Sequence, residues 1–453
     1  INLLEIWLEA QKDYEQIPGL SMSVVHDQEL IWSGGYGFSN PDKNVAETGN
    51  TIHSICSISK LFTSIAIMQL RDQGRLRLDD SIAQHLPKYN IENTYPQMGA
   101  ASIQNILTHS SGLPRESDYP YWTGPDFPFP PEEKIIDKLS DQQTLYPADR
   151  YFQYSNLGLS LAGKIVSEVS GDSFNNYIIK NILNPLGLND TRPVMPKNLY
   201  GRELAIGHEA RNRSGERPPV PLFDAEGIGP AAGFSSTVTD LAKFAAWQFR
   251  VLDGKNEVLN SNTLREMQRV HFLDEDWSPA WGLGFYIWRS NEIKFVGHGG
   301  NCPGYRSQLL IQPDRKIATV FMANASGLNS RMYAQTAYEI FESAINAAVS
   351  GKKAKTLKKR FEKYLGHYSE APWSGEAVVI AWEGELAILY LPTEDPLDLT
   401  KLKHISGNTF KRIRNSDDPE HLQTLGEEII FELDKSGQVV SLWQHSNYSK
   451  KIK

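Results

Sequence analysis

The sequence predicts an α/β domain, in which an antiparallel sheet is flanked by helices and joined to a helical subdomain, followed by a small all-β barrel. At 453 residues with 40% hydrophobic content, the chain is longer than one hydrophobic core usually covers. Strand patterns near the N-terminus and again from residue 281 to 324 enclose a helical middle. After residue 363 the pattern changes to short, evenly spaced strands, which are typical of a barrel or sandwich.

Residues 1–33 are predicted to form a helix and a hairpin. Residues 1–16 place Leu4, Trp7 and other apolar side chains at roughly helical spacing. Two apolar runs follow, at residues 20–25 and 29–33, and a polar turn joins them. This pattern indicates an antiparallel pair of strands.

Helical patterns dominate the middle of the chain, at residues 57–73, 102–107, 133–140, 157–169, 172–186 and 238–252. Residues 114–132 differ, because they form an aromatic and proline-rich loop with little room for regular structure. Such a loop either lines or covers a pocket, or is a rigid surface excursion whose aromatic rings cover the body of the protein.

Strand signals return at residues 281–288, 293–298, 305–311 and 317–324. These strands and the N-terminal hairpin together make one antiparallel sheet, which a helix at 332–349 would cover. Seven of the twelve residues from 352 to 363 are Lys or Arg, which indicates a solvated linker. We therefore divide the chain into a first domain at 1–350, a basic linker at 351–363 and a barrel at 364–453. The barrel strands are expected at 377–382, 386–391, 407–412, 428–433 and 439–444.

Composition argues against several classes of partner. The net charge of −8 is spread along the chain, so no nucleic-acid partner is expected. The histidines lack metal-ligand spacing, so we expect neither zinc nor another cofactor. No apolar run reaches the ~20 residues that a membrane-spanning helix needs, so no integral membrane segment is expected. The N-terminus carries no signal-peptide pattern, so the protein is cytoplasmic or a leader was removed; a periplasmic or secreted location is favoured.

Ser57 and Lys60 stand three residues apart at the start of an apolar helical run. On a helix this spacing places the hydroxyl and the amine on one face, close enough to exchange a proton. The first N–H groups and the dipole of the helix also favour a developing oxyanion. The pair therefore has the design of a serine nucleophile, although an N-cap serine with a solvated lysine has the same pattern.

Two further motifs follow in order. Tyr154-Ser155-Asn156 stands just before a helix, and His298-Gly299-Gly300 stands at the end of a strand. Together with Ser57-x-x-Lys60 this set resembles the penicillin-binding protein and serine β-lactamase superfamily. The Tyr-x-Asn form resembles its class C β-lactamase, esterase and D-aminopeptidase branch, which is similar to peptidase family S12. The resemblance covers about residues 15 to 345 and extends to the stretches 107–113, 229–242 and 297–305.

The resemblance implies roles for four side chains. Ser57 would be the acylated nucleophile and Lys60 its neighbouring base or source of positive field. Tyr154 would pass a proton to the leaving group and activate water for deacylation. Asn156 would bind the acyl side of the substrate or hold Lys60. Because an ammonium and a phenolate stabilise each other, we expect Lys60 and Tyr154 to titrate as a unit.

The resemblance also implies an oxyanion hole formed by the backbone N–H groups of Ser57 and Asn301, the latter on the strand that carries His298 and Gly300. His298 stands where penicillin-recognising members carry a lysine, and an imidazole is mostly neutral at pH 7. This departure disfavours β-lactamase and D,D-carboxypeptidase activity and favours esterase, amidase and aminopeptidase activity. His298 could instead only brace the strand. Arg306 could restore a nearby cation, but an ordinary surface arginine is expected.

The two cysteines flank the implied site, because Cys56 precedes the nucleophile and Cys302 follows the proposed oxyanion donor. The fold implied by the resemblance would bring their backbones close together. A disulfide is conceivable, but we expect two buried free thiols.

We therefore expect a serine hydrolase that forms an acyl-enzyme on Ser57 and hydrolyses a small ester, an amide or a D-amino-acid peptide. One alternative is a weak β-lactamase or D,D-carboxypeptidase. Another is a binding or sensor protein that is acylated with little turnover. The C-terminal module resembles the lipocalin-like barrels that follow this domain in some family members, and could narrow the entrance of the site, bind an apolar ligand or mediate homo-oligomer formation.

Overall fold

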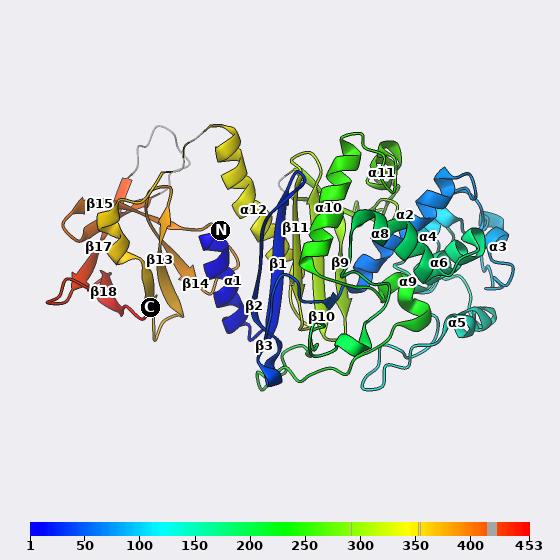
Figure 1. Ribbon diagram of the computed structural model, residues 1–453, viewed down its shortest axis with the longest axis horizontal. Coiled ribbons are helices and arrows are strands. Elements are labelled where there is room, and N and C mark those ends of the chain that lie inside the picture. The colour runs from blue at the N-terminus through cyan, green and yellow to red at the C-terminus, as the bar shows by residue number, and fades with distance from the viewer. Residues whose placement is uncertain (291, 352, 354, 415–423) are drawn as a thin grey trace. The chain divides into compact units, whose positions relative to one another are not determined.

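The computed structural model describes residues 1–290, 292–351, 353, 355–414 and 424–453 (Figure 1). Internal contacts divide the chain into two compact units, one formed by Gln16–Tyr338 and the other by Ile1–Glu15 together with Glu339–Lys453. This division places the N-terminal segment with the barrel, whereas the predicted boundaries place it with the first domain. Positions 352 and 354 of the predicted basic linker lie outside the described residues, and the linker stays a prediction.

The Gln16–Tyr338 unit is built on a nine-stranded antiparallel sheet, as the sequence predicts. The sequence-distant strands β1 and β11 lie side by side in the interior of this sheet, with Met22 opposite Phe321. The sheet order is β3 (Val45–Ala46), β2 (Glu29–Asn40), β1 (Gly19–His26), β11 (Ile317–Ala323), β10 (Tyr305–Gln312), β9 (Ile293–Cys302), β8 (Tyr286–Ser290), β7 (Ala280–Trp281) and β6 (Phe272–Leu273). The predicted strand at 281–288 is thus two strands, β7 and β8.

Helices pack on both faces of this sheet. Thr319 donates a hydrogen bond to the Ala334 carbonyl of α12 (Ser330–Val349) at 2.8 Å. On the other face, Ser23 donates to the Val238 carbonyl of α10 (Val238–Leu252) at 2.8 Å. Ser23 pairs with Val320, the residue after Thr319, and neighbouring residues of a strand point to opposite faces. The sheet therefore lies between α10 and the first turns of α12 (Figure 1).

The helical subdomain lies on the side of the sheet that α10 covers and contains the helices between β3 and α10 in sequence. A two-stranded ladder of β4 (His53–Ser54) and β5 (Ser235–Ser236) joins its first and last segments. Its helices are α2 (Ser59–Asp72), α3 (Ile82–His85), α4 (Ile103–Leu107), α5 (Glu132–Lys138), α6 (Asn156–Ser170), α7 (Phe174–Ile178), α8 (Asn184–Leu186) and α9 (Gly229–Ala232), and α11 (Ser261–Met267) follows α10. The predicted helix at 172–186 is broken by a π-turn at Ile179–Leu183 between α7 and α8.

The second unit contains an eight-stranded antiparallel barrel in which each strand pairs with the next along the chain. Its strands are β12 (Gly366–Ser369), β13 (Glu376–Trp382), β14 (Glu385–Leu391), β15 (Thr400–Ser406), β16 (Thr409–Arg414), β17 (Thr424–Leu433), β18 (Val439–Gln444) and β19 (Asn447–Lys450). A bridge between Tyr368 and Lys451 nearly closes it. Helix α1 (Asn2–Tyr14) belongs to this unit, and its Trp7 donates to the Thr393 carbonyl at 2.8 Å. The predicted barrel is confirmed; its lipocalin-like character stays a prediction.

Candidate active site

Ser57 lies in a single 3₁₀ turn, Cys56–Ile58, directly before α2. Hydrogen bonds to two other segments fix the entry to this turn. The Ile55 N–H donates to the Phe234 carbonyl at 2.9 Å, and Ser307 of β10 donates to the Ile55 carbonyl at 3.0 Å. The turn that contains Ser57 is therefore held between the α9–β5 connection and the central sheet.

Lys60 lies on the first turn of α2 with only 1% of its surface exposed. Its Nζ donates to Ser57 Oγ at 3.2 Å, to Asn156 Oδ1 at 2.8 Å and to the Ala231 carbonyl at 2.8 Å. Burial holds the pKa of Lys60 well below its usual range, and the carboxylate of Glu116 opposes this shift. A buried amine with a lowered pKa, within hydrogen-bond distance of a hydroxyl, is suited to accept its proton.

Tyr154 lies two residues before the start of α6 and beside Ser57. Its hydroxyl hydrogen-bonds with Ser57, and Lys60 Nζ lies 4.8 Å from its ring centroid. Burial raises the pKa of Tyr154 above its usual value, and this effect outweighs the hydrogen bond to Ser57. The expected attraction between a Lys60 ammonium and a Tyr154 phenolate is not the main influence, because burial has the largest effect on the pKa of both groups and favours their uncharged forms.

His109 is a side chain whose role is not predicted from the sequence, although it lies within a stretch that carries the family resemblance. Its ring stacks on the Tyr154 ring at 4.2 Å between centroids, and its Nδ1 accepts a hydrogen bond from the Ser155 N–H at 3.1 Å. Burial also holds the pKa of His109 well below its usual value, so the ring is neutral with its proton on Nε2. His109 therefore orients the loop that carries Tyr154.

Glu116 is a second side chain that sequence reasoning missed. Asn156 donates from Nδ2 to Glu116 Oε1 at 2.7 Å, while its own Oδ1 receives Lys60. Of the two contacts expected for Asn156, the structure thus contains the one to Lys60. A lone Glu in a loop gives no sequence signal for such a contact, which depends on how residues 115–116 pack against the start of α6.

His298 of β9 is buried, with 4% of its surface exposed. Its Nδ1 lies 2.7 Å from the Gly299 carbonyl oxygen, and its ring lies 5.5 Å from that of Trp281. Burial, aided by the nearby Lys60, lowers the pKa of His298 to about 3. The imidazole is therefore neutral at physiological pH and supplies no fixed positive charge.

Gly300 lets β9 approach the turn that contains Ser57. A Cβ at this position would clash with Ser307 Oγ and with the Ile55 carbonyl oxygen. Asn301, one residue later, pairs with Arg306 in the ladder to β10. Because side chains alternate along a strand, Asn301 and Arg306 point to the face opposite Gly300 and His298. Arg306 therefore does not replace the missing lysine beside His298.

Cys56 and Cys302 form a disulfide, with their Cα atoms 5.8 Å apart. The expectation of two free thiols was wrong. Cys302 ends β9 on the same face as Gly300, and the glycine allows that face to lie directly against the turn that contains Cys56. The disulfide therefore ties the turn that contains Ser57 to the strand that carries the proposed oxyanion donor.

Ser57 opens into a cavity of about 370 Å³ within the Gln16–Tyr338 unit. Aromatic rings form much of its wall, and two arginines supply its positive charge. The lining residues are Ser57, Arg115, Phe152, Tyr154, Pro279, Trp281, Tyr286, His298, Gly299, Asn301 and Arg331. Four of the seven predicted site residues line the cavity: Ser57, Tyr154, His298 and Asn301. Lys60 is bonded to Ser57, Asn156 is bonded to Lys60, and Gly300 lies against the turn that contains Ser57.

The loop at 114–132 contributes Arg115 to this cavity, but its aromatic rings point elsewhere. The Phe129 ring stacks on Phe223 at 5.7 Å between centroids, and Tyr121 packs against Phe129 at 5.0 Å. Of the two alternatives for this loop, the structure shows mainly the second, in which its aromatic rings cover the body of the protein.

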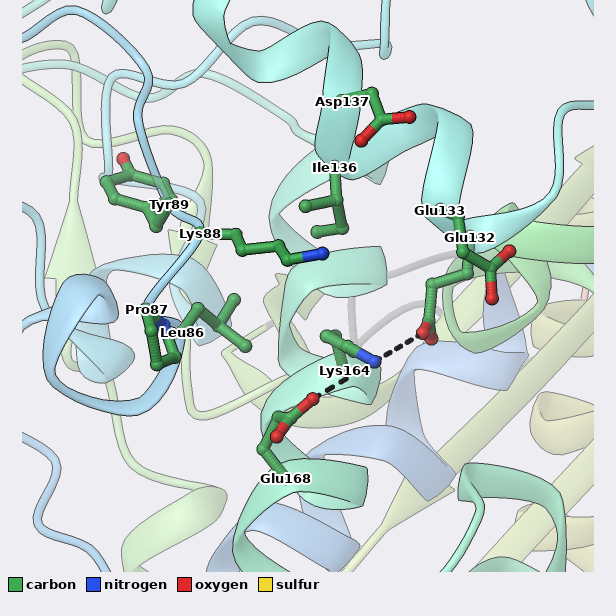
Figure 2. Close-up of a pocket in the computed structure, with 10 residues that line it drawn as sticks. All are labelled: Leu86, Pro87, Lys88, Tyr89, Glu132, Glu133, Ile136, Asp137, Lys164 and Glu168. Atoms are coloured by element: carbon green, nitrogen blue, oxygen red, sulfur yellow. Dashed lines mark ion pairs between the residues drawn. The ribbon is translucent and has the colours of Figure 1, made fainter.

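A second cavity, of about 240 Å³, lies in the helical subdomain away from these residues (Figure 2). Lys164 of α6 stands at its edge and pairs with Glu132 of α5 at 2.8 Å and with Glu168 at 3.1 Å. The charge of this lysine is thus compensated within the protein. In the part of the chain that the structure describes, no three His, Cys, Asp or Glu side chains are grouped to hold a metal ion, and no helix is long and apolar enough to cross a bilayer.

A family model described as Beta-lactamase matches residues 7–342 of the chain. Beta-lactamase-like protein 2 of Dictyostelium discoideum is 28% identical over 74% of the chain and 61% of its own length. Protein flp of Staphylococcus aureus (strain NCTC 8325 / PS 47) is 26% identical over 68% of the chain and 60% of its own length. The chain thus spans about three fifths of the length of these curated relatives.

Solved structures share the fold. An octameric penicillin-binding protein homologue from Pyrococcus abyssi aligns with a TM-score of 0.66 and 24% identity, over 99% of both chains. A D-stereospecific amidohydrolase from Streptomyces sp. aligns with a TM-score of 0.62 and 20% identity, over 74% of this chain and 97% of its own. A class C β-lactamase from Rhodobacter sphaeroides has a TM-score of 0.62 and 18% identity, over 76% of this chain and all of its own.

Proposed function

The chain belongs to the Beta-lactamase family of serine hydrolases, and we propose that it forms an acyl-enzyme on Ser57 and hydrolyses a small ester, an amide or a D-amino-acid peptide. One observation carries this proposal: Lys60 Nζ, buried and with a lowered pKa, lies 3.2 Å from Ser57 Oγ. The hydrogen bond between Tyr154 and the same hydroxyl supports it.

Acylation begins when Ser57 Oγ attacks the substrate carbonyl carbon and its proton passes to the uncharged amine of Lys60. The N–H groups of Ser57 and Asn301 would stabilise the oxyanion of the tetrahedral intermediate. As the intermediate collapses, the bond to the leaving group breaks and Tyr154 donates its phenolic proton to that group. The Lys60 ammonium then returns a proton to Tyr154, so both groups end the step uncharged.

Deacylation reverses this path with water in place of the leaving group. Water attacks the acyl carbon as its proton passes to Tyr154 and the phenolic proton passes on to Lys60. Ser57 Oγ then leaves and recovers its proton from the Lys60 ammonium. Asn156 stays bonded to Lys60 Nζ in this scheme and keeps the amine aimed at Ser57.

The neutral His298 and the aromatic wall bear on the substrate. A β-lactam or a C-terminal peptide carries a carboxylate, and an imidazole whose pKa is about 3 offers it no charge at neutral pH. Phe152, Trp281 and Tyr286 offer apolar surface for an uncharged acyl or leaving group. These features favour an ester or amide without a required carboxylate.

A second candidate, β-lactamase or D,D-carboxypeptidase activity, is favoured by the two arginines of the cavity. The Arg115 guanidinium lies 4.9 Å from the Tyr154 ring centroid, and that of Arg331 lies 4.9 Å from the Tyr286 ring centroid. Either could hold a substrate carboxylate.

We also propose that the C-terminal barrel is lipocalin-like, because it has eight antiparallel strands in sequence order and is nearly closed by the Tyr368–Lys451 bridge. We further propose that this chain assembles into a homo-oligomer, because the Pyrococcus abyssi homologue is described as octameric.

The experiment that tests the function is a panel of p-nitrophenyl esters, D- and L-aminoacyl anilides and a chromogenic cephalosporin, run on the wild type and on Ser57→Ala. The proposal predicts turnover of an ester or anilide by the wild type and none by the variant. Cephalosporin hydrolysis well above the ester rates would favour the second candidate, and turnover by Ser57→Ala would refute both.

A further inference from the structure

Glu116 stands at the end of a chain of hydrogen bonds that leads to the nucleophile. Its Oε1 accepts from Asn156 Nδ2 at 2.7 Å, Asn156 Oδ1 accepts from Lys60 Nζ at 2.8 Å, and that amine donates to Ser57 Oγ at 3.2 Å. A carboxylate, an amide, an amine and a hydroxyl are thus connected in sequence. Glu116 does not line the cavity, so it lies behind the site rather than in it.

The aromatic loop holds the Glu116 carboxylate in place. Tyr121 donates its hydroxyl to Oε2, and Trp122 donates its indole N–H to Oε1 at 3.2 Å. Arg115 Nε lies 3.3 Å from Oε1. With Asn156, four donors surround this carboxylate, which leaves it little capacity for a substrate group.

The carboxylate decides which way the Asn156 amide points. An ionised carboxylate accepts hydrogen bonds and donates none, so Asn156 must turn its NH₂ group toward Glu116. Its carbonyl oxygen is then directed at Lys60. In the opposite orientation, two oxygens would face each other at Glu116 and two donors would meet at Lys60.

The same carboxylate acts on the charge of Lys60. Glu116 favours the ammonium form of Lys60, whereas burial and Arg115 oppose it. The other titratable groups packed around this amine are Tyr154, His109 and His298, and burial favours the uncharged form of each. Among the described groups near Lys60, Glu116 is therefore the one that favours its protonated form.

We propose that Glu116 is a positioning residue, whose carboxylate fixes the Asn156 amide against Lys60 and sets the pH range over which Lys60 accepts the Ser57 proton. The mechanistic half of this inference rests on the proposed function. The aromatic loop acquires a function in this account, because Tyr121 and Trp122 hold the carboxylate that orients the base.

The test compares Glu116→Gln with the wild type in an NMR titration of [¹³Cε]lysine-labelled protein, with the Lys60 signal identified by its loss in Lys60→Met. Glutamine keeps the shape and an acceptor oxygen but removes the charge. The Lys60 midpoint should fall by about 0.5–1 pH unit in Glu116→Gln, since a nearby opposite charge typically shifts a pKa by about that much or more. An unchanged midpoint would overturn the inference, and this readout requires no substrate.

A second readout follows the chemistry, using the rate at which a fluorophosphonate probe labels Ser57 between pH 5 and 10. In this reaction Ser57 Oγ displaces fluoride and its proton passes to Lys60. The acid limb of the profile should move to lower pH in Glu116→Gln by the same amount as the NMR midpoint. A lower rate with an unmoved limb would mean a merely structural role and would also overturn the inference.

Glu203→Gln is the matched control, because Glu203 also follows an arginine and pairs with it, Arg202 Nε lying 3.7 Å from its carboxylate, but both side chains are exposed. It should leave the Lys60 midpoint and the labelling profile unchanged. The two proposals fail separately: absence of Ser57 labelling in the wild type would refute the proposed function, while the NMR titration would still decide the role of Glu116.

Discussion

The interior of the Gln16–Tyr338 unit contains acidic, lysine and histidine side chains, whereas that of the barrel unit is built mainly from aromatic and aliphatic ones. Such buried side chains of the first unit are Glu47, His53, Lys60, His109, His208, Asp240 and His298. Among the described residues of the barrel unit, the buried polar side chains are uncharged: Gln11, Ser441, Gln444 and Ser449. Burial of an ionisable group costs free energy unless the group is paired or loses its charge. In the first unit three of these side chains, Lys60, His109 and His298, lie at the candidate active site.

The largest expected effect is a loss of turnover when Lys60 is replaced, because this change should affect function much more than stability. Lys60→Met should lower turnover by about 10²–10⁴-fold, because a general base is typically worth that much. The thermal midpoint should change little in comparison, because the amine is desolvated in the folded state. Steady-state rates and thermal melts measure the two effects.

Lys164→Met is the matched control for this change. Lys164 is also a lysine on a helix of the helical subdomain, but it pairs with Glu132 and Glu168 and does not line the cavity at Ser57 (Figure 2). Its turnover should stay within about twofold of the wild type. If Lys60→Met kept wild-type turnover, the inference that the buried lysine of the first unit serves catalysis would be wrong.

The barrel unit should respond in the opposite way. Phe410 is fully buried and packs against Phe361, Tyr364 and Phe431. Phe410→Ala should cost about 3–5 kcal/mol of unfolding free energy, as removal of a buried aromatic ring typically does. Below the unfolding transition, labelling of Ser57 should stay within about twofold, because all residues that line its cavity belong to Gln16–Tyr338.

Chemical denaturation and the labelling rate measure these two effects of Phe410→Ala. A large loss of labelling in protein that is still folded would contradict the assignment of chemistry to the first unit alone.

The smallest expected effect concerns Glu47, whose carboxylate lies 3.5 Å from His53 Nε2 with both side chains fully buried. Burial raises the pKa of Glu47 to about 8, although hydrogen bonds from Ser21 and Thr51 oppose this shift. Burial lowers the pKa of His53 to about 4. A raised carboxyl pKa gives stability that is present at low pH and is lost as pH rises through 8. The His53 contribution is lost only as pH falls from 6.5 through 4.

Between pH 6.5 and 8.5 the wild type should therefore lose about 2 kcal/mol of stability through Glu47. Glu47→Gln has no such charge to bury and should show a flatter profile. Urea midpoints at both pH values measure this, and an equal decline in Glu47→Gln would show that another group is responsible.

Much of the fold could be predicted because its elements have local signals. The apolar runs at 20–25 and 29–33 and the helical spacing at 238–252 each lie within the element that they predict. Strands β12, β15 and β19 were missed. They are short or charged on their exposed face, as Lys401 and Lys403 are in β15, so periodicity cannot separate them from loops.

The candidate site could be predicted where a motif stands in the sequence, as at Ser57 and Tyr154. Glu116 and His109 were missed because their roles depend on contacts with residues about 40 positions away, at Asn156 and Ser155. The Cys56–Cys302 bond was judged wrongly for the same reason. The sequence places the two cysteines beside the motifs, but only the approach of β9 that Gly300 allows brings their sulfur atoms within bonding distance.

The central claim is that Ser57 is the acylated nucleophile of the first unit. Intact-protein mass spectrometry and peptide mapping after brief exposure to an acylating p-nitrophenyl ester test it most directly. The account predicts one acyl group on the wild type, mapped to Ser57, and none on folded Ser57→Ala. An acyl group at another residue, or equal modification of Ser57→Ala, would contradict it.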